Sequence, residues 1–118
     1  MKDDRLYLHH MLERCRRIAR FVGTGRDAFM ASEEQQDAVI RNVEVIGEAA
    51  KRVSPDVRSR LAALDWKAMC GMRDVLIHDY IEVDLDEVRN VASSRIPELQ
   101  VALERFLAGE SESVGPAR

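Results

Sequence analysis

The chain has 118 residues, of which 46% are apolar and 33% are charged, and its formal net charge is −3. That length fits one domain with a core of its own and excludes two ordinary cores. The slight acidic excess excludes a uniformly basic nucleic-acid coat but leaves room for a local basic face. An aromatic content of 5%, with only six Gly and three Pro, favours a helical bundle over a β-sandwich.

The first predicted element is an amphipathic helix over residues 4–22. Its apolar residues recur three and four positions apart, and Gly23 and Gly25 then end it. This helix is basic: residues 1–26 carry seven Lys and Arg against three acids, a net of +4, and the other 92 residues carry −7. It could follow an RNA backbone, dock an acidic partner or simply be solvated, and the last is commonest. The candidate RNA or partner contacts are Arg14, Arg17 and Arg20.

A second helix is predicted from Ser32 to about Val53. Ser32 and Gln35 stand where a capping box places them, with Ser32 accepting from the backbone and Gln35 reaching back. An apolar stripe at spacings of four and three follows. Gly47 and Ala49 are small enough to let a neighbouring helix approach closely.

A short helix is predicted over residues 55–61, because Pro55 suits a first helical turn. Asp65 can cap the next helix, which begins at Trp66. Its apolar pattern breaks at residues 81–83.

The last helical segment begins at a cap-like Asp84 and is kinked or interrupted by Pro97. Residues 1–108 are predicted to form the helical domain, and residues 109–118, which have little to bury, a flexible tail. No strand-like alternation or internal repeat appears. The fold class predicted is therefore all-α, an up-down bundle of four to five helices.

A cytoplasmic protein is predicted, because the N-terminus lacks the features of a secretory signal and no apolar run is long enough to span a membrane. Cys15 and Cys70 are interpreted as free, partly buried thiols. Neither has a second Cys or a His at ligand spacing, which argues against a zinc site. No metal and no cofactor is expected.

The strongest candidate for chemistry is the segment from Arg73 to Tyr80, which reads RDVLIHDY. Arginine presents a permanent positive fork that suits phosphate, and histidine moves protons near neutral pH. Together Arg73 and His78 could cleave a phosphodiester without a metal ion.

Helical geometry limits this interpretation, because Arg73 and His78 lie about 140° apart around one regular helix. Either the helix ends near His78 and the ring turns back, or a second copy of the chain completes the site through a two-fold dimer. The alternative is structural, with Arg73 paired to Glu44 or Glu48 and His78 bonded to backbone. Spacing alone slightly favours that alternative.

Residues 73–80 match the R-x4-H-x-Y motif of HepT-like proteins of the HEPN superfamily. Residues 40–50, IRNVEVIGEAA, resemble that family's second-helix signature. Trp66 and the segments at 71–74, 83–85 and 96–99 also stand where the pattern expects them, so the resemblance covers roughly residues 4–107. Arg89 departs from it, since many relatives carry Trp there.

The resemblance implies a homodimeric helical bundle that acts as a metal-independent endoribonuclease toxin. It also implies a small nucleotidyltransferase antitoxin of the MntA kind, as in type VII toxin–antitoxin systems. Carried over by position, Arg73 and His78 are the catalytic pair, and Tyr80 is the residue that the antitoxin modifies with AMP. Supporting roles are predicted for Asp79, Glu44 and Glu48.

Two other functions stay open from the sequence. The chain could be a non-catalytic subunit that presents a substrate to a nucleotidyltransferase, with Tyr80 as its modification or contact site. It could also be a dimeric helical scaffold, in which changes at Arg73 or His78 would lower stability or dimerisation without changing any activity.

Overall fold

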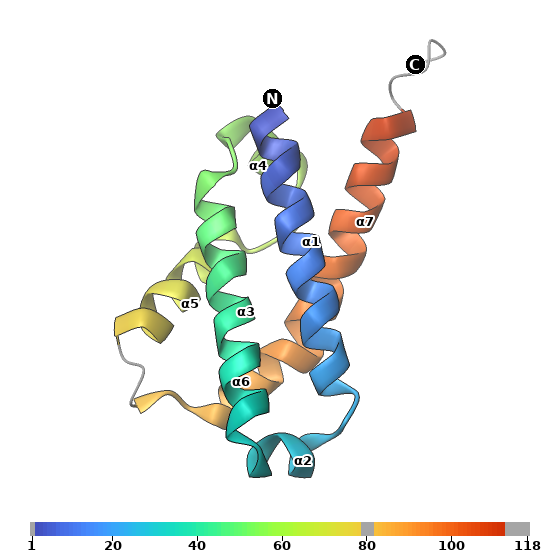
Figure 1. The fold of residues 1–118 in the computed structure, drawn as a ribbon. Coiled ribbons are helices and arrows are strands. Elements are labelled where there is room, and N and C mark those ends of the chain that lie inside the picture. The colour runs from blue at the N-terminus through green and yellow to red at the C-terminus, as the bar shows by residue number, and fades with distance from the viewer. Residues whose placement is uncertain (1, 79–81, 113–118) are drawn as a thin grey trace.

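The predicted all-α class is confirmed, since the computed structural model describes residues 2–78 and 82–112 and has helices but no strand in those ranges (Figure 1). The elements are α1 (Lys2–Val22), α2 (Arg26–Ala31), α3 (Glu33–Arg52), α4 (Pro55–Arg60), α5 (Trp66–His78), α6 (Leu85–Asn90), the π-helical segment η2 (Val91–Arg95) and α7 (Ile96–Glu112).

The short helix α2 was not predicted. It has six residues and buries only Phe29, so it carries no apolar stripe that a periodicity could detect. Gly25 precedes it with a φ of 91°, a left-handed conformation that glycine adopts without strain.

The capping box at the start of α3 forms only in part. Ser32 Oγ accepts a hydrogen bond from Gln35 N at 3.1 Å, as predicted. The predicted return bond from the Gln35 side chain is wrong, because Gln35 Oε1 instead accepts from Thr24 Oγ1 at 3.0 Å. The reason is local: the Ser32 N–H already donates to Phe29 O at the end of α2.

The predicted caps at Asp65 and Asp84 are both present. Asp65 Oδ1 accepts from Ala68 N at 2.9 Å in the first turn of α5. Asp84 Oδ1 accepts from two backbone N–H groups in the first turn of α6. Both helices therefore begin where a carboxylate satisfies amides that have no partner within the helix.

The interruption predicted at Pro97 takes the form of the π-helical segment η2, directly before α7. Proline has no N–H to donate and its ring crowds the preceding turn, and a wider turn relieves both. The helix α7 then continues past Gly109 to Glu112, into the segment predicted as a tail. The boundary of the domain at residue 108 stays a prediction.

The core forms where the long helices meet, and α3 lies between α1 and α5 (Figure 1). On its other side α1 also packs against α7, whereas α5 packs principally against α3. Fully buried side chains come from each layer: Leu8, Met11, Cys15 and Ile18 of α1, Val39 and Ile46 of α3, Leu76 of α5 and Leu103 of α7. The middle helix α3 is thus held on both sides, and α5 on one.

Candidate functional site

The helix α5 carries both residues of the predicted catalytic pair, and its first turn is firmly attached. Trp66 is buried, and its indole N–H donates to Leu61 O at 3.1 Å. Arg58 of α4 lies over the same ring, with its guanidinium carbon 5.5 Å from the ring centroid. Two residues before the end of the described helix, Leu76 is buried.

Arg73 faces α3 and is held among carboxylates. Its Nη1 donates to Asp74 Oδ1 at 2.9 Å, and its Nη2 lies 3.9 Å from Glu48 Oε2. Only 25% of the side chain is exposed. The pairing of Arg73 with Glu48, which belongs to the structural alternative raised from the sequence, is therefore present in the structure.

A second cation, Lys51 of α3, shares the same carboxylate. Its Nζ donates to Asp74 Oδ1 at 2.6 Å, so Asp74 connects Lys51 with Arg73 across the two helices. These hydrogen bonds, first from Lys51 and then from Arg73, hold the pKa of Asp74 below its ordinary value. The carboxylate consequently stays charged at neutral pH and helps to fix the guanidinium. Neither Lys51 nor Asp74 was predicted as a site residue. In the sequence, only the one-turn spacing of Lys51 from Glu48 indicates that these two residues share a face of α3.

The guanidinium of Arg73 retains unused donor capacity. Its Nε is buried and makes no hydrogen bond within the described part of the chain. An arginine has five N–H donors, and here only Nη1 donates at a short distance. A bound anion could accept from the remaining N–H groups of Nη1 and Nη2, whereas the buried Nε is closed to it.

His78 is the last residue of α5 and is exposed. In a regular helix it stands about 7.5 Å along the axis from Arg73 and about 140° around it. Arg73 therefore turns toward α3 while His78 turns to solvent. One chain does not bring the two side chains together on one face of α5.

Not every predicted site residue joins this group. Tyr80 and Asp79 lie outside the described residues. Glu44, one turn before Glu48, has a 13% exposed side chain and pairs with Arg41 at 3.4 Å. Within the described ranges Glu48 is thus the predicted carboxylate that lies beside Arg73.

The basic residues of α1 lie apart from Arg73, because α3 separates α1 from α5 (Figure 1). Arg14 Nη1 donates to the buried Asn42 of α3 at 3.2 Å. Arg17 pairs with Glu13 at 2.6 Å, and Arg20 is exposed. Their contact with RNA or a partner stays a prediction.

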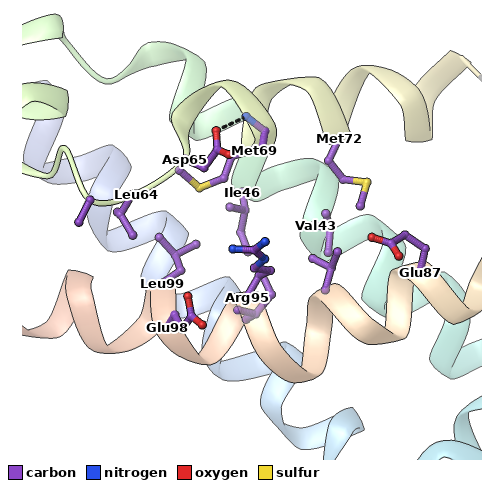
Figure 2. Close-up of a pocket in the computed structure, with 14 residues that line it drawn as sticks. Val43, Ile46, Leu64, Asp65, Met69, Met72, Glu87, Arg95, Glu98 and Leu99 are labelled. Carbon is purple, nitrogen blue, oxygen red and sulfur yellow. Dashed lines mark hydrogen bonds between the residues drawn. The ribbon is translucent and has the colours of Figure 1, made fainter.

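A cavity of about 300 Å³ lies on another side of α5, between α3, α5 and the η2–α7 segment (Figure 2). Its wall is mostly apolar, with Met69 and Met72 from α5 and Leu99 from α7, and Arg95 points into it (Figure 2). It contains no residue of the predicted site. The space leaves this side of α5 without tight packing.

Among the described residues, no group of three or more His, Cys, Asp or Glu is placed to hold a metal ion. No helix in the same ranges combines the length and the apolar character needed to cross a membrane.

Arg89, the departure from the family pattern, lies on α6 with its Nε buried and without a hydrogen-bond partner in the described part.

The sequence model of a family described as "Ribonuclease HepT-like" matches residues 11–106. The chain belongs to the HepT-like ribonuclease family. This confirms the resemblance drawn from residues 73–80 and from the second-helix segment.

Curated relatives carry ribonuclease names. The chain is 34% identical over 111 residues to "Putative RNase TTE0752" of Caldanaerobacter subterraneus subsp. tengcongensis, covering 93% of this chain and 99% of that protein. It is 36% identical over 78 residues to "Probable ribonuclease HepT" of Thermococcus cleftensis, covering 66% and 71%.

A third relative is longer. "Gamma-glutamylcyclotransferase and putative RNase MJ0434" of Methanocaldococcus jannaschii is 39% identical over 100 residues, which are 84% of this chain. The chain spans 45% of the length of that protein. No solved structure matches the chain.

Proposed function

We propose that this chain is a metal-independent endoribonuclease toxin in which Arg73 and His78 cut RNA. The chain belongs to the HepT-like ribonuclease family, and its helix α5 carries two groups suited to cutting RNA. Arg73 is held in place and has N–H groups without a partner in the described part of the chain, and the imidazole of His78 is exposed. An anchored cation suits a phosphate, and an accessible imidazole suits proton transfer.

The proposed chemistry begins at the ribose. The 2′-oxygen attacks the adjacent phosphorus, the bond from phosphorus to the 5′-oxygen breaks, and a 2′,3′-cyclic phosphate and a 5′-hydroxyl result. His78 takes the proton from the 2′-hydroxyl or supplies one to the leaving oxygen. Arg73 stabilises the charge that grows on the phosphoryl oxygens. DNA lacks the 2′-hydroxyl and is not cut.

A homodimer would complete this site, because one chain holds a single His78 turned away from Arg73. The surface of α5 beside His78 supports a second copy there. Val75 and Ile77 are 52% and 40% exposed, and large exposed apolar side chains favour a covered face. In a two-fold dimer the partner's His78 would serve as the second proton-transfer group.

The test uses purified wild type, Arg73→Ala and His78→Ala with one RNA and a DNA of the same sequence, in EDTA. The wild type should cut only RNA, and each variant should lose about 100-fold or more in rate. Arg60→Ala, a substitution of an exposed arginine on α4, is the matched control and should cut normally. Unchanged cleavage by both site variants would contradict the proposal.

The proposal includes an antitoxin, a small nucleotidyltransferase of the MntA kind that modifies Tyr80. The tyrosyl oxygen would attack the α-phosphorus of ATP, pyrophosphate would leave, and the phenolic proton would pass to solvent. The AMP ester would add a phosphate charge and bulk two residues from His78 in the chain, which would repel RNA. Its support is the family membership and the position of Tyr80 two residues after His78.

Coexpression with a small nucleotidyltransferase encoded by an adjacent gene tests the proposed modification of Tyr80. The intact mass should rise by one AMP, and Tyr80→Phe should prevent both the increase and the neutralisation of toxicity. A wild-type protein that binds the neighbour tightly but never cuts RNA would instead support the non-catalytic subunit.

A further inference from the structure

Gly47 of α3 lies directly against Arg73 of α5. A Cβ added at residue 47 would overlap the Cβ of Arg73 and would lie 2.8 Å from the carbonyl oxygen of Met69 and 3.2 Å from Arg73 Cγ. Real Cβ atoms essentially never come as close to other heavy atoms as this one would to Arg73 Cβ and the Met69 oxygen. Any side chain at residue 47 therefore requires a shift at the position of Arg73.

The two nearest neighbours cannot turn away as a flexible side chain would. The Met69 oxygen belongs to the backbone of α5, and the Arg73 Cβ is bonded directly to it. A rotamer change at Arg73 relieves neither overlap. The backbone of one helix must move.

The packing indicates that α5 is the helix that moves. The middle helix α3 also packs against α1, and its Val39, Ile46 and Ala50 are buried. The helix α5 packs principally against α3 and has the cavity of about 300 Å³ along another side (Figure 2). The less restrained element yields first.

We propose that Gly47 is a positioning residue: its missing side chain sets the depth at which α5 docks and so places Arg73 at the reacting phosphate. Gly47 acts through the position of α5, where it lies directly against Arg73; His78, further along the same helix, is displaced with it. The inference rests on the proposed ribonuclease function for its activity readout, although the placement of Arg73 can be measured without it.

The same crossing sets the contacts that hold the guanidinium. Glu48 and Lys51 lie one and four residues after Gly47 on α3, and they reach Arg73 and Asp74 respectively. Moving α5 outward would lengthen both contacts together. The 3.9 Å separation between Arg73 Nη2 and Glu48 Oε2 would be lost first.

The principal test is Gly47→Ala, assayed well below its unfolding temperature. A displacement of about 1 Å costs on the order of 100-fold in rate, so kcat should fall by about that factor. KM should change by less than about threefold, because Arg73 acts mainly on charge that develops in the transition state.

Two controls separate positioning from ordinary effects on the helices. Gly109→Ala adds the same methyl group in α7, where a Cβ would meet nothing within 4 Å, and should leave kcat unchanged. Leu103→Ala removes a fully buried side chain of α7 and should lower Tm at least as much as Gly47→Ala. It should keep its kcat per folded molecule.

A double variant tests whether Gly47 acts through Arg73. Once Arg73→Ala has removed the guanidinium, the displacement of α5 can act only on His78, so adding Gly47→Ala should reduce the remaining rate by about tenfold or less. A full further loss of about 100-fold in the double variant would overturn the proposal. Wild-type kcat in Gly47→Ala would overturn it as well.

The Nε–H signal of Arg73 in 15N NMR, assigned by its absence in Arg73→Ala, gives a readout independent of cleavage. It should shift in Gly47→Ala and stay unchanged in Gly109→Ala. If the wild type cuts no RNA, the proposed function fails while this signal still decides the positioning role. An unmoved signal in Gly47→Ala rejects that role whatever the activity.

Discussion

The buried carboxylate of Asp4 accepts two hydrogen bonds from Ser54, one from its N–H and one from its Oγ, each at 2.7 Å. Asp4 lies in the first turn of α1 and is 4% exposed, and Ser54 caps α4, so the contact joins segments 50 residues apart. Burial by itself would raise the pKa of Asp4. The hydrogen bonds from Ser54 act in the opposite direction, and together with the positive charge of the N-terminal amine they hold that pKa below its ordinary value.

Asp4→Asn should therefore weaken the fold at neutral pH, by about 2 kcal/mol in the free energy of unfolding. Because the pKa of Asp4 is lower in the folded state, its contribution is complete above the unfolded pKa of about 3.9 and is lost as pH falls through the folded value. Urea unfolding at pH 7 and pH 3 should show the wild type and Asp4→Asn converging in acid.

Asp3→Asn is the matched control, because Asp3 is the exposed neighbour of Asp4 in the same turn. Its substitution should change the free energy of unfolding by less than about 0.5 kcal/mol. Equal losses in the two variants would show that the Ser54 contacts contribute nothing particular.

Asp74→Asn should affect activity more than stability. Asp74 Oδ1 accepts from both Lys51 and Arg73 on the surface, where ion pairs contribute little to folding. We expect a loss of about tenfold in kcat, since the guanidinium is oriented less firmly. Steady-state cleavage and thermal unfolding measure the two effects separately.

Asp56→Asn provides the comparison, since Asp56 pairs with Arg60 on the surface of α4 at 3.5 Å. It should leave both readouts unchanged. If Asp74→Asn cut RNA at the wild-type rate, the Lys51–Asp74–Arg73 connection would have no part in catalysis.

Arg58→Ala should destabilise the end of α3 by about 2 kcal/mol. Arg58 Nη2 donates to Ala50 O at 2.8 Å and its Nε donates to Val53 O at 3.1 Å, while its guanidinium lies over Trp66. Trp66 is the single tryptophan of the chain, so its fluorescence reports unfolding directly.

Arg60→Ala, two residues further on α4, should shift the same transition by less than about 0.5 kcal/mol, because Arg60 makes an exposed pair with Asp56. If the unfolding transition of Arg58→Ala coincided with that of the wild type, the hydrogen bonds from Arg58 to the carbonyls of Ala50 and Val53 would contribute no more to stability than hydrogen bonds from water.

The two cysteines should differ in their reactivity. Burial raises the pKa of Cys15 to about 12, whereas Cys70 of α5 is partly exposed. Since the thiolate is the reactive form, iodoacetamide at pH 8 should label Cys70 first and leave Cys15 unlabelled in the native protein. Peptide mass spectrometry measures both sites, and in urea both should react. Native labelling of Cys15 at the rate of Cys70 would contradict the burial seen here.

Local rules made much of the fold predictable. The stripe of α1, the caps at Asp65 and Asp84 and the interruption at Pro97 each depend on residues a few positions apart. The helix α2 was not predicted because six residues are too few to show a helical period. The return bond from Gln35 failed because the end of α2 had already occupied the Ser32 N–H.

The helical class, the family motif and the candidates Arg73 and His78 could be predicted because they follow from residue type and short-range spacing. The surroundings of Arg73 could not, because they depend on how distant segments pack. Lys51 and Asp74 are 23 residues apart in the chain and come together only because α5 docks on α3. Gly47 is recognisable in the sequence as a small residue. Its contact with Arg73 depends on where α3 and α5 cross. That crossing is set by long-range packing, which no local pattern encodes.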